Sequence, residues 1–223
     1  MQIFDATDLP LSSAQYGIWV DIQIHPHDTS YSLAEGIELR GPINDDLLIN
    51  AIQQAVSEAA SLHATFFERD GEPRQRIVPG KEVAVTLLDF STMPKAHEAA
   101  QTWMAADAAI PFDVQKDSLF RNALIRISDD CLYWYRNYHH LVVDGVAMRT
   151  LLARVADAYC ALERGESVIV RCDMQHYLAH LADDLNYRTS ARHDTDRDYW
   201  EITYREPPEP TTFSSRGPQW TGQ

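Results

Sequence analysis

The sequence has no apolar run long enough to cross a membrane, and its first residues lack the cationic start and apolar core of a secretory signal. We therefore expect a cytoplasmic protein with no membrane partner. Positive charge is also scarce, because 19 lysines and arginines face 33 aspartates and glutamates, a formal net charge of -14. This excess of acid would repel a phosphate backbone, so nucleic acid is not expected as a partner.

Cysteine is rare, and Cys131, Cys160 and Cys172 are odd in number and widely spaced. This pattern argues against both a disulfide framework and a zinc site. His176 and His180 share a helix face, but no glutamate follows the first histidine as a metalloprotease requires. Glycine-rich phosphate loops are absent from the sequence as well. We expect this chain to bind no metal and no nucleotide.

The composition itself is that of a folded globular protein, with 223 residues, of which 45% are apolar and 23% are charged. Segments with strand and helix patterns alternate, which predicts an α/β fold. We predict strands at residues 31–40, 63–69, 73–78, 83–88, 119–127 and 131–139. We predict helices at about residues 45–61, 97–109, 145–162, 174–188 and 194–204, with Pro94 in the first turn of the second.

Two turn signals predict hairpins within this pattern. Asp70-Gly71 joins the second and third predicted strands, and residues 128–130 join the fifth and sixth. In the fifth strand Arg121 interrupts an otherwise apolar face, which indicates a role for Arg121 beyond packing.

The run Tyr-His-His-Leu-Val-Val-Asp-Gly, residues 138–145, ends an aromatic strand and precedes a predicted helix. Acyl transfer from a thioester needs a group of near-neutral pKa that takes the proton of the attacking amine or hydroxyl and orients it. His140 is the candidate for this role. Asp144 can fix the local geometry by an ion pair or by accepting backbone N–H bonds, and Gly145 allows the chain to turn and approach closely.

A structural interpretation competes at each of these positions. A histidine pair at a strand end is often packed and hydrogen-bonded, and Asp-Gly is a common turn. Because adjacent strand residues point to opposite faces, we expect His139 to be structural, and we expect Asp144 to act as a helix cap or ion-pair partner. Four fixed positions within seven residues, at a strand-to-helix junction, favour the catalytic interpretation for His140.

The same residues resemble the His-His-x-x-x-Asp-Gly signature shared by condensation domains of nonribosomal peptide synthetases, chloramphenicol acetyltransferase and their relatives. Residues 9–19, Leu-Pro-Leu-Ser-Ser-Ala-Gln-Tyr-Gly-Ile-Trp, are similar to the opening condensation motif Ser-x-Ala-Gln-x-x-x-Trp. Residues 133–140 and 198–200 are similar to the enterobactin-type siderophore synthetases. The signature lies in the middle of this chain, as in the N-terminal lobe of a condensation domain, and not near the C-terminus as in the acetyltransferases.

This resemblance implies a chloramphenicol acetyltransferase-like two-layer α/β sandwich, a mixed sheet flanked by helices, forming a single lobe at residues 8–205. It implies that His140 assists attack of an acceptor amine on a donor thioester. Both substrates would be carried on phosphopantetheine arms of peptidyl or aryl carrier protein domains, so the cofactor would belong to the partners. Residues 206–223, rich in Pro, Ser, Thr and Gly, are expected to be a linker or a frayed tail.

Two departures from the family pattern affect this expectation. His63 stands where the family usually has an arginine that pairs with the signature aspartate, so any bond from His63 to Asp144 would be weaker and pH-dependent. A complete condensation domain also has a second, C-terminal lobe, which supplies the other wall of the substrate tunnel. We therefore expect the chain alone to lack a closed active site. Whether it is an excised lobe, a natural truncation or half of a split protein is open.

Three functional hypotheses are consistent with the sequence. The first is an amide-forming lobe that uses His140. The second is a catalytically silent module that docks carrier proteins, and the third is a self-assembling trimeric acyltransferase that completes its site between identical subunits.

Overall fold

The computed structural model describes residues 6–167 and 172–208 of the chain. The chain divides into two compact units, Met1–Ala182 and Asp183–Gln223, and the boundary falls within helix α5 (Met174–Arg188). Each unit is described by itself. Among the helices of the described residues, none combines the length and the apolar character that crossing a membrane requires.

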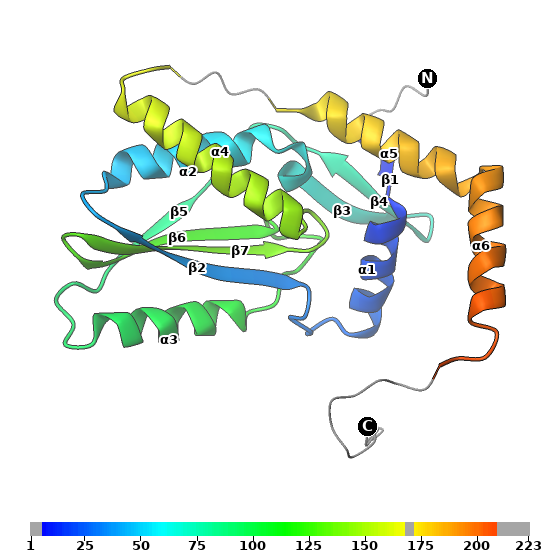
Figure 1. Cartoon of the computed structure of the whole chain (residues 1–223), viewed down its shortest axis with the longest axis horizontal. Helices are drawn as coiled ribbons and strands as arrows, with labels where there is room; N and C mark the ends of the chain where they lie inside the picture. Colours follow the sequence, from blue (N-terminus) through cyan, green and yellow to red (C-terminus); the bar gives the residue numbers. More distant parts are fainter. Residues whose placement is uncertain (1–5, 168–171, 209–223) are drawn as a thin grey trace, which may run out of the picture. The chain divides into compact units, whose positions relative to one another are not determined.

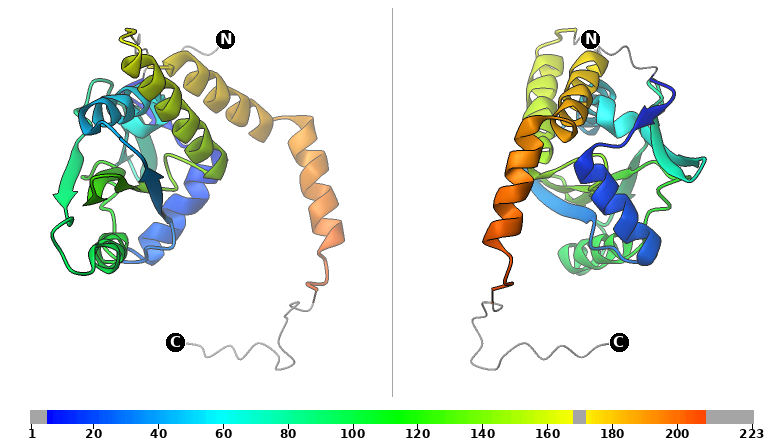
Figure 2. Two further views of the ribbon diagram at one scale, coloured as in Figure 1. Left: turned by 60° about the vertical axis from the view of Figure 1, so that its left-hand side comes forward. Right: turned by 90° about the vertical axis from the view of Figure 1, so that its right-hand side faces the viewer.

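The first unit is built around a mixed sheet in the order β2 (Ser32–Arg40), β7 (Cys131–His139), β6 (Phe120–Ser128) and β5 (Val85–Asp89). β5 runs parallel to β6, whereas the other two pairings are antiparallel. Helices α2 (Asp45–Glu58) and α4 (Gly145–Glu163) cover one face and α3 (Ala96–Ala108) covers the other (Figure 1). Figure 2 shows the same sheet and its helices from two further directions. The predicted α/β class, with a mixed sheet flanked by helices, is confirmed.

β7 is the most enclosed strand of this sheet, since all nine of its residues are buried. It has a hydrogen-bonded neighbour on each side and helices on both faces. On the α3 face its aromatic residues join a core of buried side chains from β6 and α3, namely Ala100, Ala123, Ile125, Ile127, Cys131, Tyr133 and Tyr135. The strand that leads into the signature is therefore held rigidly along its length.

A second, antiparallel sheet has the order β1 (Leu9–Pro10), β4 (Glu72–Ile77) and β3 (Ala64–Arg69). Asp70 and Gly71 join β3 to β4 with φ angles of 53° and 80°. Two consecutive positive φ values are typical of the type I′ turn that Asp-Gly favours, so the predicted hairpin is confirmed. Helix α1 (Ser13–Ile24) comes after β1 and begins with a reciprocal cap between Ser12 and Gln15.

Two predicted helix boundaries are wrong in detail. α2 ends at Glu58 and not at residue 61, because Ala59 leaves the helical region and Ala60–His63 form a separate 3-10 helix, η1. Pro94 lies outside α3, because Lys95 has non-helical angles (φ -136°, ψ 57°) and the helix begins only at Ala96.

Arg121 has the role beyond packing that its position in β6 indicated. Its guanidinium pairs with the Asp107 carboxylate at 3.1 Å and donates to the carbonyl oxygens of Asp107 (3.0 Å) and Ile110 (2.8 Å). Asp107 lies in the last turn of α3, and Ile110 lies two residues beyond the end of the helix. Arg121 thus fastens the end of α3 to the sheet, and it also stacks over the Phe112 ring at 4.0 Å.

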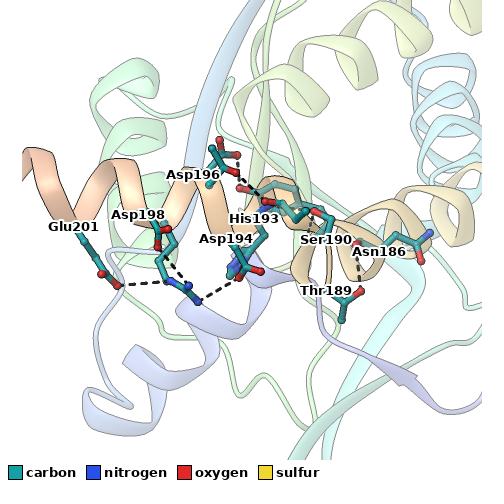
Figure 3. A network of polar contacts seen from close by, with 12 residues as sticks. Asn186, Thr189, Ser190, His193, Asp194, Asp196, Asp198 and Glu201 are labelled. Atoms are coloured by element: carbon teal, nitrogen blue, oxygen red, sulfur yellow. Dashed lines mark hydrogen bonds and ion pairs between the residues drawn. The ribbon is translucent and has the colours of Figure 1, made fainter.

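The second unit consists, in the described residues, of the end of α5, the helix α6 (Ala191–Thr203) and the residues after it. Ser190 caps α6 by accepting a bond from the His193 backbone N–H at 3.2 Å, and the Tyr187 hydroxyl donates to Asp196 at 2.8 Å. Along α6, Arg197 pairs with the acids Asp194, Asp198 and Glu201 (Figure 3). The Ser190 cap explains why α6 starts three residues before the predicted position 194. The tail expected at residues 206–223 lies outside the described residues from position 209 onward.

Candidate active site

The signature loop, residues 140–144, connects the end of β7 to the start of α4. Its entry is fixed by two backbone bonds, because the N–H of His139 donates to the Leu119 carbonyl at 2.9 Å and the N–H of His140 donates to the Tyr31 carbonyl at 2.8 Å. Tyr31 immediately precedes β2, and Ser32 is the register partner of His139. The loop therefore starts from a backbone that is held on both sides.

His139 is buried, with 4% of its surface exposed, and its ring serves the loop itself. Its Nδ1 accepts a bond from the Leu141 backbone N–H at 3.1 Å, so the proton of the neutral ring must be on Nε2. Burial lowers the pKa of His139 to about 4, and the neighbouring charge of His140 acts in the same direction. The ring also meets Phe112 edge-to-face, with 5.9 Å between the ring centroids. The His139 ring is buried and neutral and accepts a hydrogen bond from the backbone, so it supports the structure of the signature loop.

His140 has a different environment from its neighbour. It is half-buried, and among the described residues its ring has no hydrogen-bond or ion-pair partner. Only its backbone is anchored, through the bond to Tyr31. The imidazole is consequently available to an incoming group while its position along the chain stays fixed.

Asp144 is the N-cap of α4. Its carboxylate accepts a bond from the Ala147 backbone N–H at 2.7 Å, and its carbonyl accepts one from the Met148 N–H at 2.9 Å. A negative charge at this end also interacts favourably with the helix dipole. From the sequence we considered a helix cap and an ion pair for Asp144, and the structure has the helix cap.

Gly145 does not have the left-handed backbone conformation in which glycine is favoured. Its φ is not positive, and a Cβ atom added there would meet no other atom within 4 Å. The turn expected at Gly145 therefore does not depend on glycine, and its close approach to another group stays a prediction. The first residue of α4 is exposed and borders open space beside the signature loop.

His63 is not brought to Asp144. It is fully buried in η1, and its Nε2 donates to the Ser57 carbonyl at 3.2 Å, while its Nδ1 has no partner among the described residues. Burial is the largest cause that lowers the pKa of His63. Within the part of the chain that the structure describes, no hydrogen bond joins His63 to Asp144, so the weak bond considered from the sequence is not formed.

Arg136 is a supporting residue that sequence reasoning missed. Only 2% of its surface is exposed, and it lies on β7 opposite Glu35 of β2, with which it pairs at 2.5 Å. Its Nη1 donates to the Met148 carbonyl in the first turns of α4 at 2.9 Å. Arg136 thus ties the strand before the loop to the helix after it. The signal was present as a single charged residue within a buried aromatic strand.

An open groove of about 950 Å³ runs along α4 from Asp144 towards Arg154 and is closed on its other side by the end of α2 and by Cys172 and Asp173. The backbone N–H of Asp173 donates to the Glu58 carbonyl at 2.9 Å and so holds this wall in place. Among the described residues, no group of three or more His, Cys, Asp or Glu side chains is arranged to hold a metal ion.

Comparison with known proteins shows which protein family has this signature loop. A family model described as the condensation domain matches residues 5–217. The chain belongs to the condensation domain family. Condensation domains of nonribosomal peptide synthetases are acyltransferase-type enzymes that form amide bonds and work with carrier protein domains.

Two curated relatives illustrate the match. A dimodular nonribosomal peptide synthase of Bacillus subtilis (strain 168) is 35% identical over 217 residues, which cover 96% of this chain and 9% of the relative. Enterobactin synthase component F of Escherichia coli O157:H7 is 31% identical over 210 residues, covering 92% of this chain and 16% of the relative. The resemblance to enterobactin-type synthetases that the sequence indicated is confirmed.

Solved structures agree with the fold. A mutant of the starter condensation domain of rhizomide synthetase, in complex with C8-CoA, matches with a TM-score of 0.86 and 32% identity, covering 95% of this chain and 48% of that one. The first condensation domain of the calcium-dependent antibiotic synthetase matches with a TM-score of 0.82 and 27% identity, covering 92% and 49%. The chain therefore spans about half the length of the solved condensation domains that it matches.

Proposed function

We propose that this chain is the N-terminal lobe of a peptide synthetase condensation domain and that it contributes His140 to amide bond formation. The observation that carries the proposal is the contrast within the signature pair. His139 is buried and committed to the Leu141 N–H, whereas the His140 ring is half-buried and unengaged, among the described residues, beside an anchored backbone. A group that must take or orient a proton needs that freedom.

In the proposed reaction the nitrogen of the acceptor amine attacks the carbonyl carbon of the donor thioester. A new C–N bond forms, the C–S bond breaks, and the thiolate leaves with its electron pair. His140 accepts or orients the proton that the amine loses, and that proton finally neutralises the thiolate. An unprotonated imidazole nitrogen is required at the start, because only its free lone pair can accept the proton of the amine.

Both substrates would arrive as thioesters on the phosphopantetheine arms of carrier domains, so this chain supplies no cofactor of its own. The coverage of about half of each solved condensation domain supports assignment as one lobe, with a second lobe as a partner. A mutant of the rhizomide starter domain was solved in complex with C8-CoA, so an acyl-CoA is a second candidate for the donor. Residues 8–205 would form the lobe and residues 206–223 a linker.

The test substitutes His140→Ala in this chain, supplied together with a second lobe and with loaded donor and acceptor carriers. We expect the rate of amide formation, measured by mass spectrometry of the carrier-bound product, to fall at least ~100-fold, because general acid–base catalysis contributes about that much or more. The thermal unfolding midpoint should not change. His180→Ala is the matched control, because His180 is an exposed histidine of the same unit.

Unchanged product formation by His140→Ala would overturn the catalytic role. If carriers bind the chain and no amide forms with either the wild type or the variant, the alternative of a silent docking module is favoured. A trimeric mass in solution would instead favour a site shared between identical subunits.

A further inference from the structure

Both backbone polar groups of Leu141, the residue directly after His140, are hydrogen-bonded to side chains. Its N–H donates to His139 Nδ1 at 3.1 Å, and its carbonyl accepts from Gln15 Nε2 at 3.0 Å. Leu141 is itself 2% exposed, so water does not readily replace either partner. Two side chains, one from β7 and one from α1, therefore hold the backbone at Leu141, beside the backbone bond from the Val142 N–H to the His139 carbonyl at 3.1 Å.

The orientation of the Gln15 amide is fixed by groups that have only one possible role. Its Oε1 accepts from the Ser12 backbone N–H at 3.0 Å, and a backbone N–H can only donate. Its Nε2 faces the Leu141 carbonyl, which can only accept. The two backbone groups therefore fix which side of the Gln15 amide carries the nitrogen and which carries the oxygen.

A buried cluster holds Gln15 in this position. Gln75 is fully buried and donates through Nε2 to Gln15 Oε1 at 2.9 Å and to the Pro10 carbonyl at 2.9 Å. The Tyr177 hydroxyl donates to Gln75 Oε1 at 2.5 Å and lies 3.2 Å from Gln15 Nε2. Three elements distant in sequence, α1, β4 and α5, thus meet at the side-chain amide that donates to the Leu141 carbonyl.

We propose that Gln15 is a positioning residue for His140: by donating to the Leu141 carbonyl it sets the path of the signature loop and with it the place of the catalytic imidazole. The opening motif and the signature then meet at one carbonyl. The effect on the rate rests on the proposed function of His140, whereas the effect on the loop does not.

The physical reason is the difference between a satisfied and an unsatisfied buried carbonyl. Without its donor, the Leu141 carbonyl stays unpaired and carries a desolvation penalty unless the loop moves or admits water. Either response displaces the backbone next to His140. Misplacement of a catalytic group by about 1 Å can lower a rate by roughly 100-fold.

Two substitutions separate this role from simple packing. Gln15→Met keeps the length of the side chain and removes both polar atoms. Gln15→Glu keeps an acceptor for the Ser12 N–H, and a glutamate at this position also completes a capping box. It places an oxygen, however, against the Leu141 carbonyl. If Gln15 acts only as a cap or a filler, Gln15→Glu should behave as the wild type.

The first measurement is amide hydrogen exchange at Leu141 in the whole chain, which needs no catalytic assay. We expect exchange at least ~10-fold faster in both Gln15 variants. Gln53→Met is the control, because the Gln53 amide on α2 also donates to a backbone carbonyl, that of Val83 at 3.0 Å, and this carbonyl does not belong to the signature loop. The control should leave Leu141 exchange unchanged.

The second measurement is condensation in the two-lobe assay. We expect kcat to fall at least ~10-fold in both Gln15 variants with KM changed less than about twofold, since the substrates still bind. Wild-type Leu141 exchange in Gln15→Glu, or an equal effect of Gln53→Met, would overturn the inference. The inference would also be overturned if the Leu141 amide exchanged faster in the Gln15 variants while they kept the wild-type rate of a condensation reaction that depends on His140. If His140→Ala itself is active, the proposed function fails while the exchange result still decides the loop contact.

Discussion

Three buried or half-buried histidines lie among the described residues of the first unit, and their surroundings give each a different chemistry. His139 is enclosed and must stay neutral to accept the Leu141 N–H. His63 is enclosed in η1 and donates to Ser57. His140 alone combines an anchored backbone with a ring that has no partner in the described residues. The three histidines therefore differ in role because their local burial differs, although they are the same type of residue.

At this scale the pKa of His139 predicts how stability depends on pH. The unfolded chain binds a proton at His139 near pH 6.5, whereas the folded chain does so only near pH 4. Between these values the unfolded state holds more protons, so the free energy of unfolding decreases as the pH falls. The loss from His139 is about 2 kcal/mol at pH 5 and about 3 kcal/mol below pH 4.

Urea unfolding of the wild type and of His139→Gln at about pH 7 and about pH 5 measures this contribution. We expect the wild type to lose about 2 kcal/mol more than the variant on acidification, because the variant has no group that titrates there. His63 is present in both proteins, so its own titration cancels in the comparison. Equal losses in the two proteins would contradict the burial of a neutral His139.

The partner of the His63 side chain could not be inferred from the sequence. The sequence revealed that an expected arginine was replaced, and a histidine is chemically able to bond an aspartate. It could not reveal that α2 ends early and that η1 turns the His63 ring towards Ser57, because that turn is not marked by glycine or proline. Strand alternation, which is a local rule, indicated only that His139 and His140 point to opposite faces; it could not indicate the burial of His139, because every residue of β7 is buried.

At the scale of elements, the start of α4 is the part of the site whose stability is most easily measured. Asp144 caps α4 in the way that Asn44 caps α2, where Asn44 accepts from the Leu47 N–H at 3.1 Å. Both caps are exposed, and both belong to the first unit. The two helices therefore provide a matched pair.

We expect Asp144→Ala to lower the free energy of unfolding by about 1 kcal/mol and Asp144→Asn to lower it by less than about 0.5 kcal/mol, because asparagine is an equally good cap. Asn44→Ala should cost about the same as Asp144→Ala. Urea denaturation followed by circular dichroism measures all three variants. A loss from Asp144→Asn as large as that from Asp144→Ala would show that the charge of Asp144, and not the cap, stabilises the loop.

Elements with local signals were predicted well. Asp70-Gly71 marked the β3–β4 hairpin, and the aromatic run marked β7. The pairing of β2 with β7 and the parallel pairing of β5 with β6 were not predicted, because they join segments far apart in sequence. The contact of Gln15 with Leu141 depends on such non-local packing, which explains why the opening motif gave no hint of its partner.

At the scale of the whole molecule, the hydrophobic core of the described residues is confined to the first unit. Its most C-terminal buried member is Leu181 on α5, and α6 has no buried residue. Tyr177, on the same helix, joins the cluster around Gln15. The stability of the first unit should thus depend on α5 and little on the residues beyond it.

Deleting residues 189–223 should therefore lower the thermal unfolding midpoint by less than about 4 °C, which corresponds to about 1 kcal/mol for a chain of this size. Deleting residues 174–223 also removes Leu181 and Tyr177, and we expect a clearly larger loss. Differential scanning calorimetry of the two truncated chains tests this. A loss after the first deletion as large as that after the second would show that the second unit is part of the same cooperative fold.

The backbone bond from His140 to Tyr31 also links the site to the order in which the chain assembles. β6 and β7 are joined by a two-residue turn and can pair locally, whereas β2 reaches β7 only after a long loop has closed. β2 is also an edge strand of its sheet. The imidazole that we assign to catalysis is thus positioned by a long-range strand pairing, the kind of contact that forms most slowly during folding. Fraying of the β2 edge would free the His140 backbone while the rest of the unit stays folded.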